Sequence, residues 1–266
     1  YYQDLGDRKA PKLDAPVVRL LDEFDASYGF VGNTRPVFFF QTDNTAPRSR
    51  IVAVDTRKPD SKSWRELVPQ AADPIEGSQI VHNTFVIRYL HDAASVLRMY
   101  ALDGKPAGDV QLPTLGSIAS VTGEPKDDEM FYSFTSFLYP TTIFRHDFKT
   151  GQSSVFKAPE ISFDASSYET VQVFYRSKDG TRAPMFLTYK KGLKRDGQNA
   201  TYLYAYGGFN VNMTPGFSIG VLAWLEMGGV YAQGVLRGGS EYGEEWHQAG
   251  MLERKQNVFD DFIAAA

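Results

Sequence analysis

The sequence contains no cysteine among its 266 residues. This absence excludes disulfides, thiolate nucleophiles and cysteine-ligated metal sites. It leaves the compartment open, because a protein without thiols tolerates both reducing and oxidising surroundings. We expect a soluble protein, either cytoplasmic or periplasmic.

Long apolar runs and charge of one sign are also scarce. The most apolar stretch, residues 217–236, is interrupted by Glu226, Gly228 and Gly229, which argues against a membrane span and favours a buried helix followed by a buried strand. The 28 basic and 32 acidic residues are spread along the chain and give a formal charge of −4, so no basic patch is available for phosphates. We therefore expect neither a membrane nor a nucleic acid as partner.

Histidines are few, and they do not form a metal-binding pattern. The four are His82, His91, His146 and His247. No pair has a ligand spacing such as His-x-x-x-His. The sequence therefore predicts no metal site, and no cofactor is expected.

Aromatic residues, by contrast, make up 14% of the chain, which favours β-structure. They recur in three units, each with an aromatic strand, a turn and a second strand that ends in aspartate; the paired segments are residues 37–40 with 51–55, 85–90 with 97–104, and 130–134 with 142–147. The closing residues Asp55, Asp103 and Asp147 lie 48 and 44 positions apart. This period is typical of four-stranded propeller blades.

We interpret the three aspartates as structural, since a carboxylate in such a turn accepts backbone N–H bonds two residues on. A single blade cannot bury both faces of its sheet, so the repeat predicts neighbouring blades that this chain does not supply. Tyr1 and Tyr2 resemble the last strand of a preceding blade. An all-β sandwich is the alternative architecture, but it would not require the long period.

From residue 168 onward the pattern changes. Residues 171–175 and 185–189 alternate and flank Asp179-Gly180, which is the strongest short-range signal of a β-hairpin. A surface loop is expected over residues 190–199.

The remaining residues predict a strand, a crossover helix and a second strand. We expect a buried strand at residues 200–205, an apolar helix near 217–227 and a strand at 230–236. This succession is the unit of a parallel α/β sheet. A final helix is expected from about Gln256, with three apolar residues on one face, namely Phe259, Phe262 and Ile263.

Three motifs follow one another in the C-terminal third: residues 206–210 (YGGFN), 237–244 (RGGSEYGE) and 255–262 (KQNVFDDF). In this order they resemble the prolyl oligopeptidase family of serine peptidases. The similarity extends back through the hairpin and through residues 132–137 and 89–92, so it covers nearly the whole chain.

The resemblance implies a seven-bladed propeller joined to an α/β-hydrolase domain, and cleavage of short peptides on the carboxyl side of proline. It implies that residues 1–160 are later blades of a partial β-propeller, about three to four of them. Residues 161–266 would then be the N-terminal part of the α/β-hydrolase domain.

Two site residues follow from the resemblance. Tyr206 matches the tyrosine whose hydroxyl points into the oxyanion hole, and a phenol with a pKa of about 10 can donate without ionising. Phe209 matches an aromatic that lines the pocket for the substrate proline, where a flat ring packs on the pyrrolidine. Gly207 and Gly208 are expected to let the backbone turn sharply enough to present both side chains. Without the resemblance, Tyr206 would be interpreted as a core tyrosine.

Ser240 lies among glycines but fails the nucleophile-elbow motif, because Tyr242 occupies the place of the second flanking glycine. We interpret residues 237–243 as a structural turn held by Arg and Glu, in which Ser240 replaces a third glycine usual in the family. In the family the Ser, Asp and His of the triad lie downstream of the helix where this sequence stops. No nucleophile, acid or base is expected here, and the chain alone is expected to be inactive.

The expected partners are short proline-containing peptides and the remainder of the same enzyme. Three alternatives remain open: a related oligopeptidase of different specificity, a non-enzymatic propeller used as a binding module, and one piece of a nicked enzyme. Residues 200–266 separate the enzyme from the binding module, because a pure propeller has no use for a strand–helix–strand unit with an oxyanion tyrosine.

Overall fold

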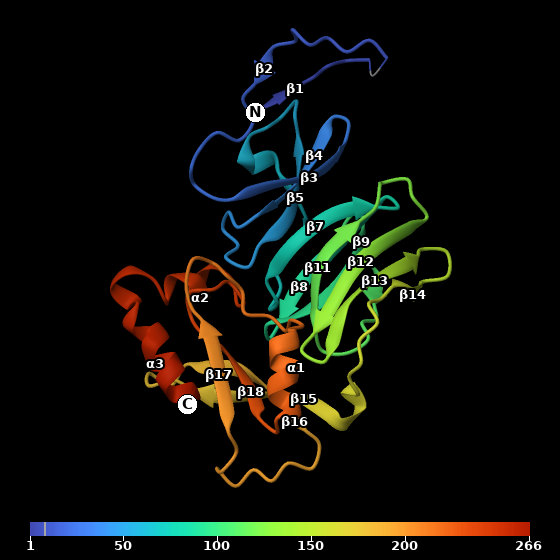
Figure 1. Cartoon of the computed structure of the whole chain (residues 1–266). Helices are drawn as coiled ribbons and strands as arrows, with labels where there is room; N and C mark the ends of the chain where they lie inside the picture. The colour runs from blue at the N-terminus through green and yellow to red at the C-terminus, as the bar shows by residue number, and fades with distance from the viewer. Residues whose placement is uncertain (8) are drawn as a thin grey trace.

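The computed structural model describes residues 1–7 and 9–266. Within this part of the chain the strands form five sheets, of which four are four-stranded (Figure 1). Three of these are antiparallel and follow one another in chain order, and we call them the first, second and third sheets. Their strands are β3 (Tyr28–Thr34), β4 (Val37–Thr42), β5 (Arg50–Asp55) and β6 (Arg65–Val68); β7 (Ile75–Val81), β8 (Thr84–His91), β9 (Ala94–Ala101) and β10 (Pro106–Val110); and β11 (Ser117–Thr122), β12 (Glu129–Ser136), β13 (Tyr139–Asp147) and β14 (Gln152–Lys157).

The predicted strand pairs are the two middle strands of each sheet. The outer strands were not predicted, because β3 and β10 carry glycine or proline and lack a continuous apolar run. The turns after β5, β9 and β13 confirm the role of the aspartates. Asp55, Asp103 and Asp147 each accept a bond from the backbone N–H two residues on, at 2.9, 3.1 and 2.8 Å.

The second sheet is buried on both faces. Along β8, Phe85 and Ile87 pack into a core shared with Phe39 of the first sheet, whereas Val86 packs into a core shared with Tyr132 of the third sheet. Alternate residues of a strand point to opposite faces, so the sheets are stacked in series. This arrangement differs from the alternative two-sheet sandwich, which has one core between two sheets.

Two short strands precede the first sheet. β1 (Tyr2–Gln3) pairs with β2 (Val17–Val18), and the Tyr2 ring lies 5.2 Å from the ring of Phe38 in the first sheet. A 3₁₀ turn at Ser61–Ser63 leads into β6, and another at Ala165–Ser167 leads into the C-terminal part.

The last four strands form the C-terminal sheet, in the order β15-β16-β18-β17. The predicted hairpin is confirmed as β15 (Tyr168–Arg176) and β16 (Arg182–Lys190). The predicted strand–helix–strand unit is confirmed as β17 (Thr201–Tyr206), α1 (Ile219–Glu226) and β18 (Val230–Val235), with β17 and β18 parallel. Two helices follow, α2 (Glu244–Gln248) and α3 (Gln256–Ala265), with a 3₁₀ turn at Leu252–Arg254 between them.

Helices α1 and α3 cover opposite faces of this sheet. Tyr231 and Val235 of β18 share a core with α1. A Cβ at Gly234, the residue before Val235, would lie on the opposite face of the strand, 3.9 Å from Ala265 Cβ at the end of α3. None of the helices in the described part of the chain is both long and apolar enough to cross a bilayer.

One expectation about burial is wrong. β17 was expected to be buried, but Tyr202 and Tyr204 are 51% and 42% exposed, because β17 is an edge strand of the described sheet. On α3, Phe259 and Ile263 of the apolar face are exposed. The helix instead buries the face that carries Val258 and Asp261, since Asp261 pairs with a buried arginine.

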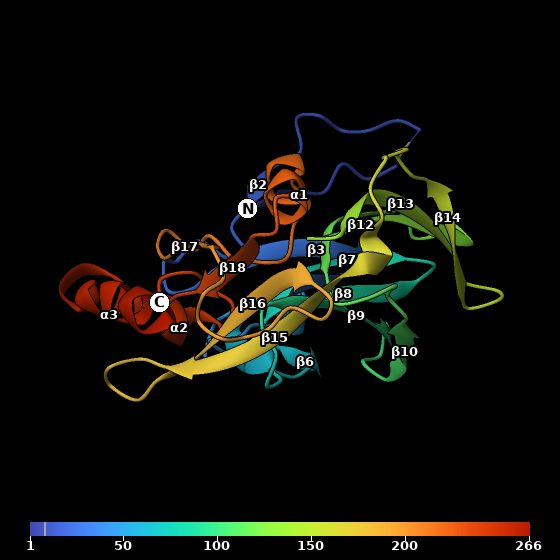
Figure 2. The same ribbon diagram turned by 60° about the horizontal axis from the view of Figure 1, so that its bottom comes forward.

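The tips of two hairpins from the antiparallel part contact the C-terminal sheet. Ala93, between β8 and β9, and Phe137, between β12 and β13, are buried in one core with Phe186 of β16 and Leu222 of α1. Figure 2, in which the C-terminal sheet comes forward, shows β15 and β16 in front of strands of the antiparallel sheets. The blade-like sheets and the C-terminal sheet therefore share a core.

Candidate active site

Tyr206 ends the edge strand β17, at the carboxyl end of the parallel pair. It is in register with Val235, so its side chain lies on the face that α1 covers. The residue is 40% exposed, so its ring is not sealed in the core. Ligands of open α/β sheets bind at the carboxyl ends of the strands, and Tyr206 occupies such an end.

Phe209 lies three residues further on, in what we call the 207–213 loop. It is 87% exposed. Phe209 and Asn210 have φ of 52° and 56°, in the left-handed region that side chains disfavour. The left-handed part of the turn is therefore made by Phe209 and Asn210, and not by Gly207 or Gly208. Gly207 is needed for close packing, since a Cβ there would lie 2.8 Å from the Arg237 carbonyl oxygen and 2.4 Å from Val258 Cγ1.

The 207–213 loop is bonded along its length to residues 237–243, which we call the glycine-rich turn. The Asn210 amide donates to the Gly238 carbonyl at 3.1 Å. Asn212 Oδ1 accepts bonds from the Ser240 amide and hydroxyl at 2.8 and 3.0 Å. The Met213 amide donates to Glu241 Oε1 at 2.7 Å. Two motifs that are separate in sequence thus form one structural unit.

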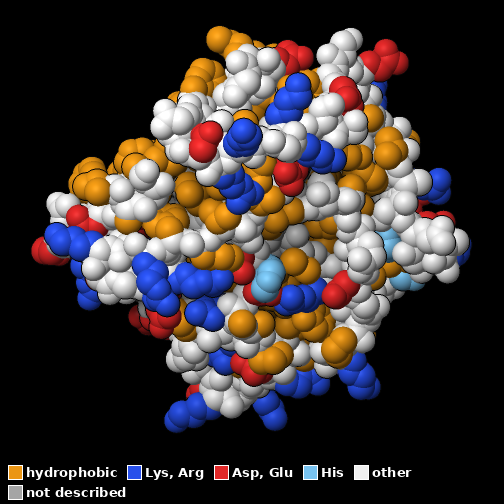
Figure 3. All heavy atoms as spheres, turned by 90° about the horizontal axis from the view of Figure 1, so that it is seen from below, with side chains coloured by type: hydrophobic (Ala, Val, Ile, Leu, Met, Phe, Trp, Pro, Cys, Tyr) orange, Lys and Arg blue, Asp and Glu red, His pale blue; other side chains and the backbone are white. Residues whose placement is uncertain are grey.

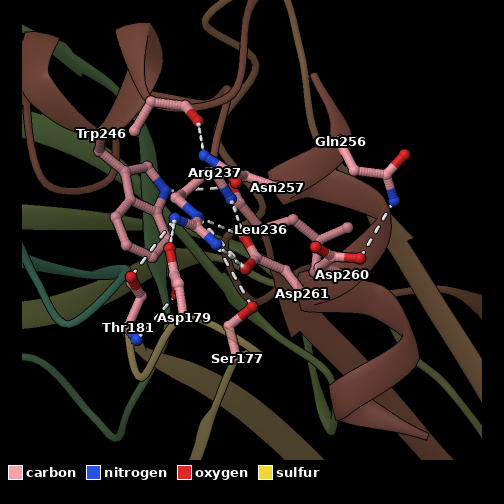
Figure 4. Close-up of polar contacts among 11 residues, drawn as sticks. Ser177, Asp179, Thr181, Leu236, Arg237, Trp246, Gln256, Asn257, Asp260 and Asp261 are labelled. Carbon is pink, nitrogen blue, oxygen red and sulfur yellow. Dashed lines mark hydrogen bonds and ion pairs between the residues drawn. The ribbon is translucent and has the colours of Figure 1, made fainter. Parts of the chain in front are cut away.

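The Arg237 guanidinium fixes the glycine-rich turn to the rest of the C-terminal part (Figure 4). It makes a 2.6 Å ion pair with Asp261 of α3, whose side chain is fully buried, and a 2.6 Å ion pair with Asp179 of the β15–β16 hairpin. Ser177 and Thr181 supply further acceptors at 3.3 Å. The hydrogen bond from Arg237 holds the pKa of Asp179 well below its usual range. The interpretation of this turn as structural agrees with these contacts.

Glu241 is a buried carboxyl that sequence reasoning did not single out as part of the site. It is 0% exposed, and its Oε2 has no hydrogen-bond partner among the described residues. Burial raises the pKa of Glu241 to about 7, against weaker opposing hydrogen bonds from backbone amides. Its signal in the sequence was a lone acid inside a run of glycines, which is also typical of an exposed turn.

Two cavities adjoin the 207–213 loop. One, of about 400 Å³, lies between the antiparallel sheets and the C-terminal part of the chain. Asn210, Asn212 and Ser240 line it on the C-terminal side, and Arg48 and Glu76 are among the residues that line it on the other side. The second, of about 450 Å³, is lined by Phe209 and by apolar residues that include Met251. Phe209 thus borders a largely apolar hollow.

A serine–histidine–aspartate triad is not found among residues 1–7 and 9–266. The serine–histidine hydrogen bond within this range joins Ser153 to His146 at 3.0 Å, but His146 Nε2 is buried without a partner. Burial lowers the pKa of His146. Ser240 bonds to Asn212 and not to a histidine.

Within the described range, no group of three or more potential ligand side chains could hold a metal ion. On the face seen in Figure 3, positive and negative side chains are interspersed, with hydrophobic side chains between them. No charge of one sign dominates this face.

Comparison with known proteins gives matches along most of the chain. The model of the prolyl oligopeptidase N-terminal β-propeller domain matches residues 1–159, and the three antiparallel sheets fit a propeller. The model of the prolyl oligopeptidase family itself matches residues 215–266.

Curated relatives include the prolyl endopeptidase of Elizabethkingia miricola, which is 38% identical over 93% of this chain and 35% of its own length. The prolyl endopeptidase of Dictyostelium discoideum is 36% identical over 100% of this chain and 36% of its own length. The chain therefore spans about a third of the length of these relatives.

Solved structures show the same similarity. One prolyl endopeptidase, studied for the role of inter-domain dynamics in catalysis and specificity, has a TM-score of 0.90 and 43% identity over 96% of this chain and 38% of its own. Prolyl oligopeptidase B from Galerina marginata, bound to a 35-residue substrate, has a TM-score of 0.90 and 31% identity over 97% of this chain and 37% of its own. By its motifs, its sheets and these matches, the chain belongs to the prolyl oligopeptidase family.

Proposed function

We propose that this chain is part of a serine endopeptidase that hydrolyses short peptides on the carboxyl side of proline. The observation that carries the proposal is the position of Tyr206. It lies half-exposed at the carboxyl end of a parallel strand, next to a loop that lines the cavity between the two parts of the molecule. Relatives that match nearly the whole chain are named prolyl endopeptidases, which supports the substrate class.

Residues 1–160 would supply three complete blades, with β1 and β2 belonging to a further one. Residues 161–266 would be the N-terminal part of an α/β-hydrolase domain. The strand order β15-β16-β18-β17, with a helical crossover between the parallel strands, supports the second assignment.

In the proposed reaction a serine oxygen attacks the carbonyl carbon of the proline residue, and negative charge develops on the carbonyl oxygen. The Tyr206 hydroxyl would donate a hydrogen bond to that oxygen. The bond from carbon to the leaving nitrogen then breaks, and the nitrogen takes up the proton that the serine released. Phe209 would pack its ring against the proline ring before and during this step.

The nucleophile, acid and base would come from residues outside these 266, because the described residues place no histidine between a serine and a carboxylate. The 266-residue chain alone would then be inactive. The match of residues 215–266 to the peptidase family weighs against a non-enzymatic binding module. The exposure of Phe209 beside an apolar cavity favours an uncharged ring over a basic residue in the pocket.

The test is a kinetic comparison in a full-length enzyme that contains this segment. With a chromogenic peptide that has proline before the scissile bond, Tyr206→Phe should lower kcat about 10² to 10³-fold, as loss of one oxyanion donor does. Tyr204→Phe is the matched control, because Tyr204 lies on the same face of the same strand at similar exposure. Full activity in Tyr206→Phe would defeat the assignment.

Phe209→Ala tests the pocket. It should raise KM for the proline peptide and leave cleavage of an otherwise identical alanine peptide nearly unchanged, since alanine lacks the ring that Phe209 would contact. Equal effects on both peptides would contradict a role in proline recognition.

A further inference from the structure

The two proposed substrate contacts share one short stretch of backbone. Tyr206 directly precedes the 207–213 loop, and Phe209 belongs to it. Phe209 is almost fully exposed and lies on left-handed backbone, so little packing fixes the direction of its ring. A group that contacts a reacting substrate must nevertheless be placed closely, because an error of 1 Å can cost about 10²-fold in rate.

Two polar side chains fix this loop. Glu241 Oε1 accepts the Met213 amide at 2.7 Å, at the end of the loop. Asn212 Oδ1 accepts both donors of Ser240. Glu241 and Ser240 belong to the glycine-rich turn, which Arg237 joins to α3 and to the β15–β16 hairpin. The loop is therefore bonded to a part of the structure that is itself fixed.

The surroundings of Glu241 are fitted closely to its carboxyl group. A Cβ at Gly239 would lie 2.3 Å from Glu241 Oε2 and 2.7 Å from the Val211 carbonyl oxygen. A fully buried carboxyl without an ion-pair partner is destabilising, and burial raises its pKa. Its side chain contacts the loop through the hydrogen bond from the Met213 amide, so a role in holding the loop accounts for its presence.

We propose that Glu241 is a positioning residue for the peptidase reaction, and that Asn212 is a second one. Glu241 acts through Met213 and the loop backbone on the place of the Tyr206 hydroxyl and on the direction of the Phe209 ring. This inference rests on the proposed function, because it requires Tyr206 and Phe209 to contact the substrate.

The first test compares two replacements of Glu241 in a full-length enzyme that contains this segment. Glu241→Leu removes the acceptor and should lower kcat about tenfold and reduce the preference for the proline peptide over the alanine peptide. Glu241→Gln keeps an oxygen for the Met213 amide and should stay within about threefold of the parent. Leu225→Ala removes a buried side chain of α1 from the core that the helix shares with β18; it is the control for loss of stability alone and should leave both quantities unchanged. A folded Glu241→Leu enzyme with parental kcat and preference would overturn the proposal.

The second test asks whether Glu241 acts through Tyr206. If it does, the double variant Glu241→Leu/Tyr206→Phe should be less impaired than the product of the two single effects. Multiplying effects would overturn the proposal. If Glu241→Leu does not fold, Asn212→Ala replaces it in both tests. Because Asn212 also holds the loop, Asn212→Ala should lower kcat roughly three- to fivefold and combine with Tyr206→Phe in the same non-additive way. Unchanged kcat in Asn212→Ala would overturn the inference.

The two proposals can fail separately. A fully active Tyr206→Phe enzyme would remove the proposed function. A slow Tyr206→Phe enzyme together with a parental Glu241→Leu enzyme would remove only the positioning role.

Discussion

Tyr242 donates a hydrogen bond from its hydroxyl to Asp92 Oδ1 at 2.7 Å, across 150 positions of sequence. Asp92 lies at the two-residue turn between β8 and β9, where Asp92 and Ala93 have φ of 48° and 66°, as a tight hairpin requires. The main-chain oxygen of Asp92 also accepts a bond from Gln172 of β15. One hairpin tip of the second sheet is thus bonded to both the glycine-rich turn and the C-terminal sheet.

Replacing Tyr242 by phenylalanine should lower the free energy of unfolding by about 1–2 kcal/mol, because the partly buried Asp92 carboxylate loses a donor. Urea unfolding of the parent and the variant measures the difference. Tyr204→Phe, on an exposed edge strand, should change it by less than about 0.5 kcal/mol. Equal stability of the parent and Tyr242→Phe would show that the hydrogen bond between Tyr242 and Asp92 contributes nothing to the free energy of unfolding.

Glu241 predicts a specific pH dependence of stability. Its pKa is raised to about 7 from 4.5, so the folded state prefers the protonated form. The penalty is absent below pH 4.5, grows as pH rises, and is complete above pH 7. The parent should therefore lose on the order of 3 kcal/mol relative to Glu241→Gln between these limits.

Unfolding free energies of the parent and Glu241→Gln at pH 4.5 and pH 8 give this difference. Tyr242, which lies next to Glu241 in the chain, and Glu76, which lines the same cavity as Ser240, are present in both proteins. Tyr242 keeps its proton because burial raises its pKa, and burial also raises the pKa of Glu76. Parallel pH profiles for the two proteins would contradict a buried carboxyl that titrates near neutrality.

Asp261 and Asp179 offer a matched pair, since each carboxylate lies 2.6 Å from the same arginine. Asp261 is fully buried, whereas the Asp179 side chain is 46% exposed. Asp261→Asn should cost about 3–5 kcal/mol, because it leaves the Arg237 charge buried with a weaker partner. Asp179→Asn should cost about 1 kcal/mol or less. Thermal unfolding of the two variants tests the ranking, and a reversed or equal order would mean that burial does not decide the strength of this network.

Two glycine replacements should act in opposite directions. Gly239→Ala places a methyl group 2.3 Å from Glu241 Oε2 and should destabilise the protein by about 1–3 kcal/mol. Gly220→Ala lies in α1, where the nearest atom would be 3.7 Å away, and should stabilise the helix by about 0.5–1 kcal/mol. Urea midpoints of both variants measure the shifts. A tolerated alanine at 239 would show that the carboxyl can move.

Local sequence signals predicted the elements that depend on them. The Asp179-Gly180 hairpin and the α1 crossover follow from turn chemistry and apolar patterning. Asp55, Asp103 and Asp147 indicated where one middle strand of each of three sheets ends, because the carboxylate of a turn aspartate accepts a hydrogen bond from the backbone two residues on. These contacts lie within a few residues of one another, so the sequence shows both partners.

Long-range contacts could not be predicted in the same way. The pattern of α3 places Phe259, Phe262 and Ile263 on one face but does not show which face is buried; Asp261 turns inward because it pairs with the buried Arg237. β17 is apolar and aromatic, yet its exposure depends on which strand is its neighbour. Glu241 is the same kind of case, because its partner is the Met213 amide in another motif. The roles of Tyr206 and Phe209 rest on the family resemblance and stay predictions.

Ala93 and Phe137 come from hairpin tips of the antiparallel sheets, but they complete a core that otherwise belongs to β16, β18 and α1. Separating the two parts would leave that core open to water. We therefore expect calorimetry to record a single heat-absorption peak for both parts, and not one peak for each.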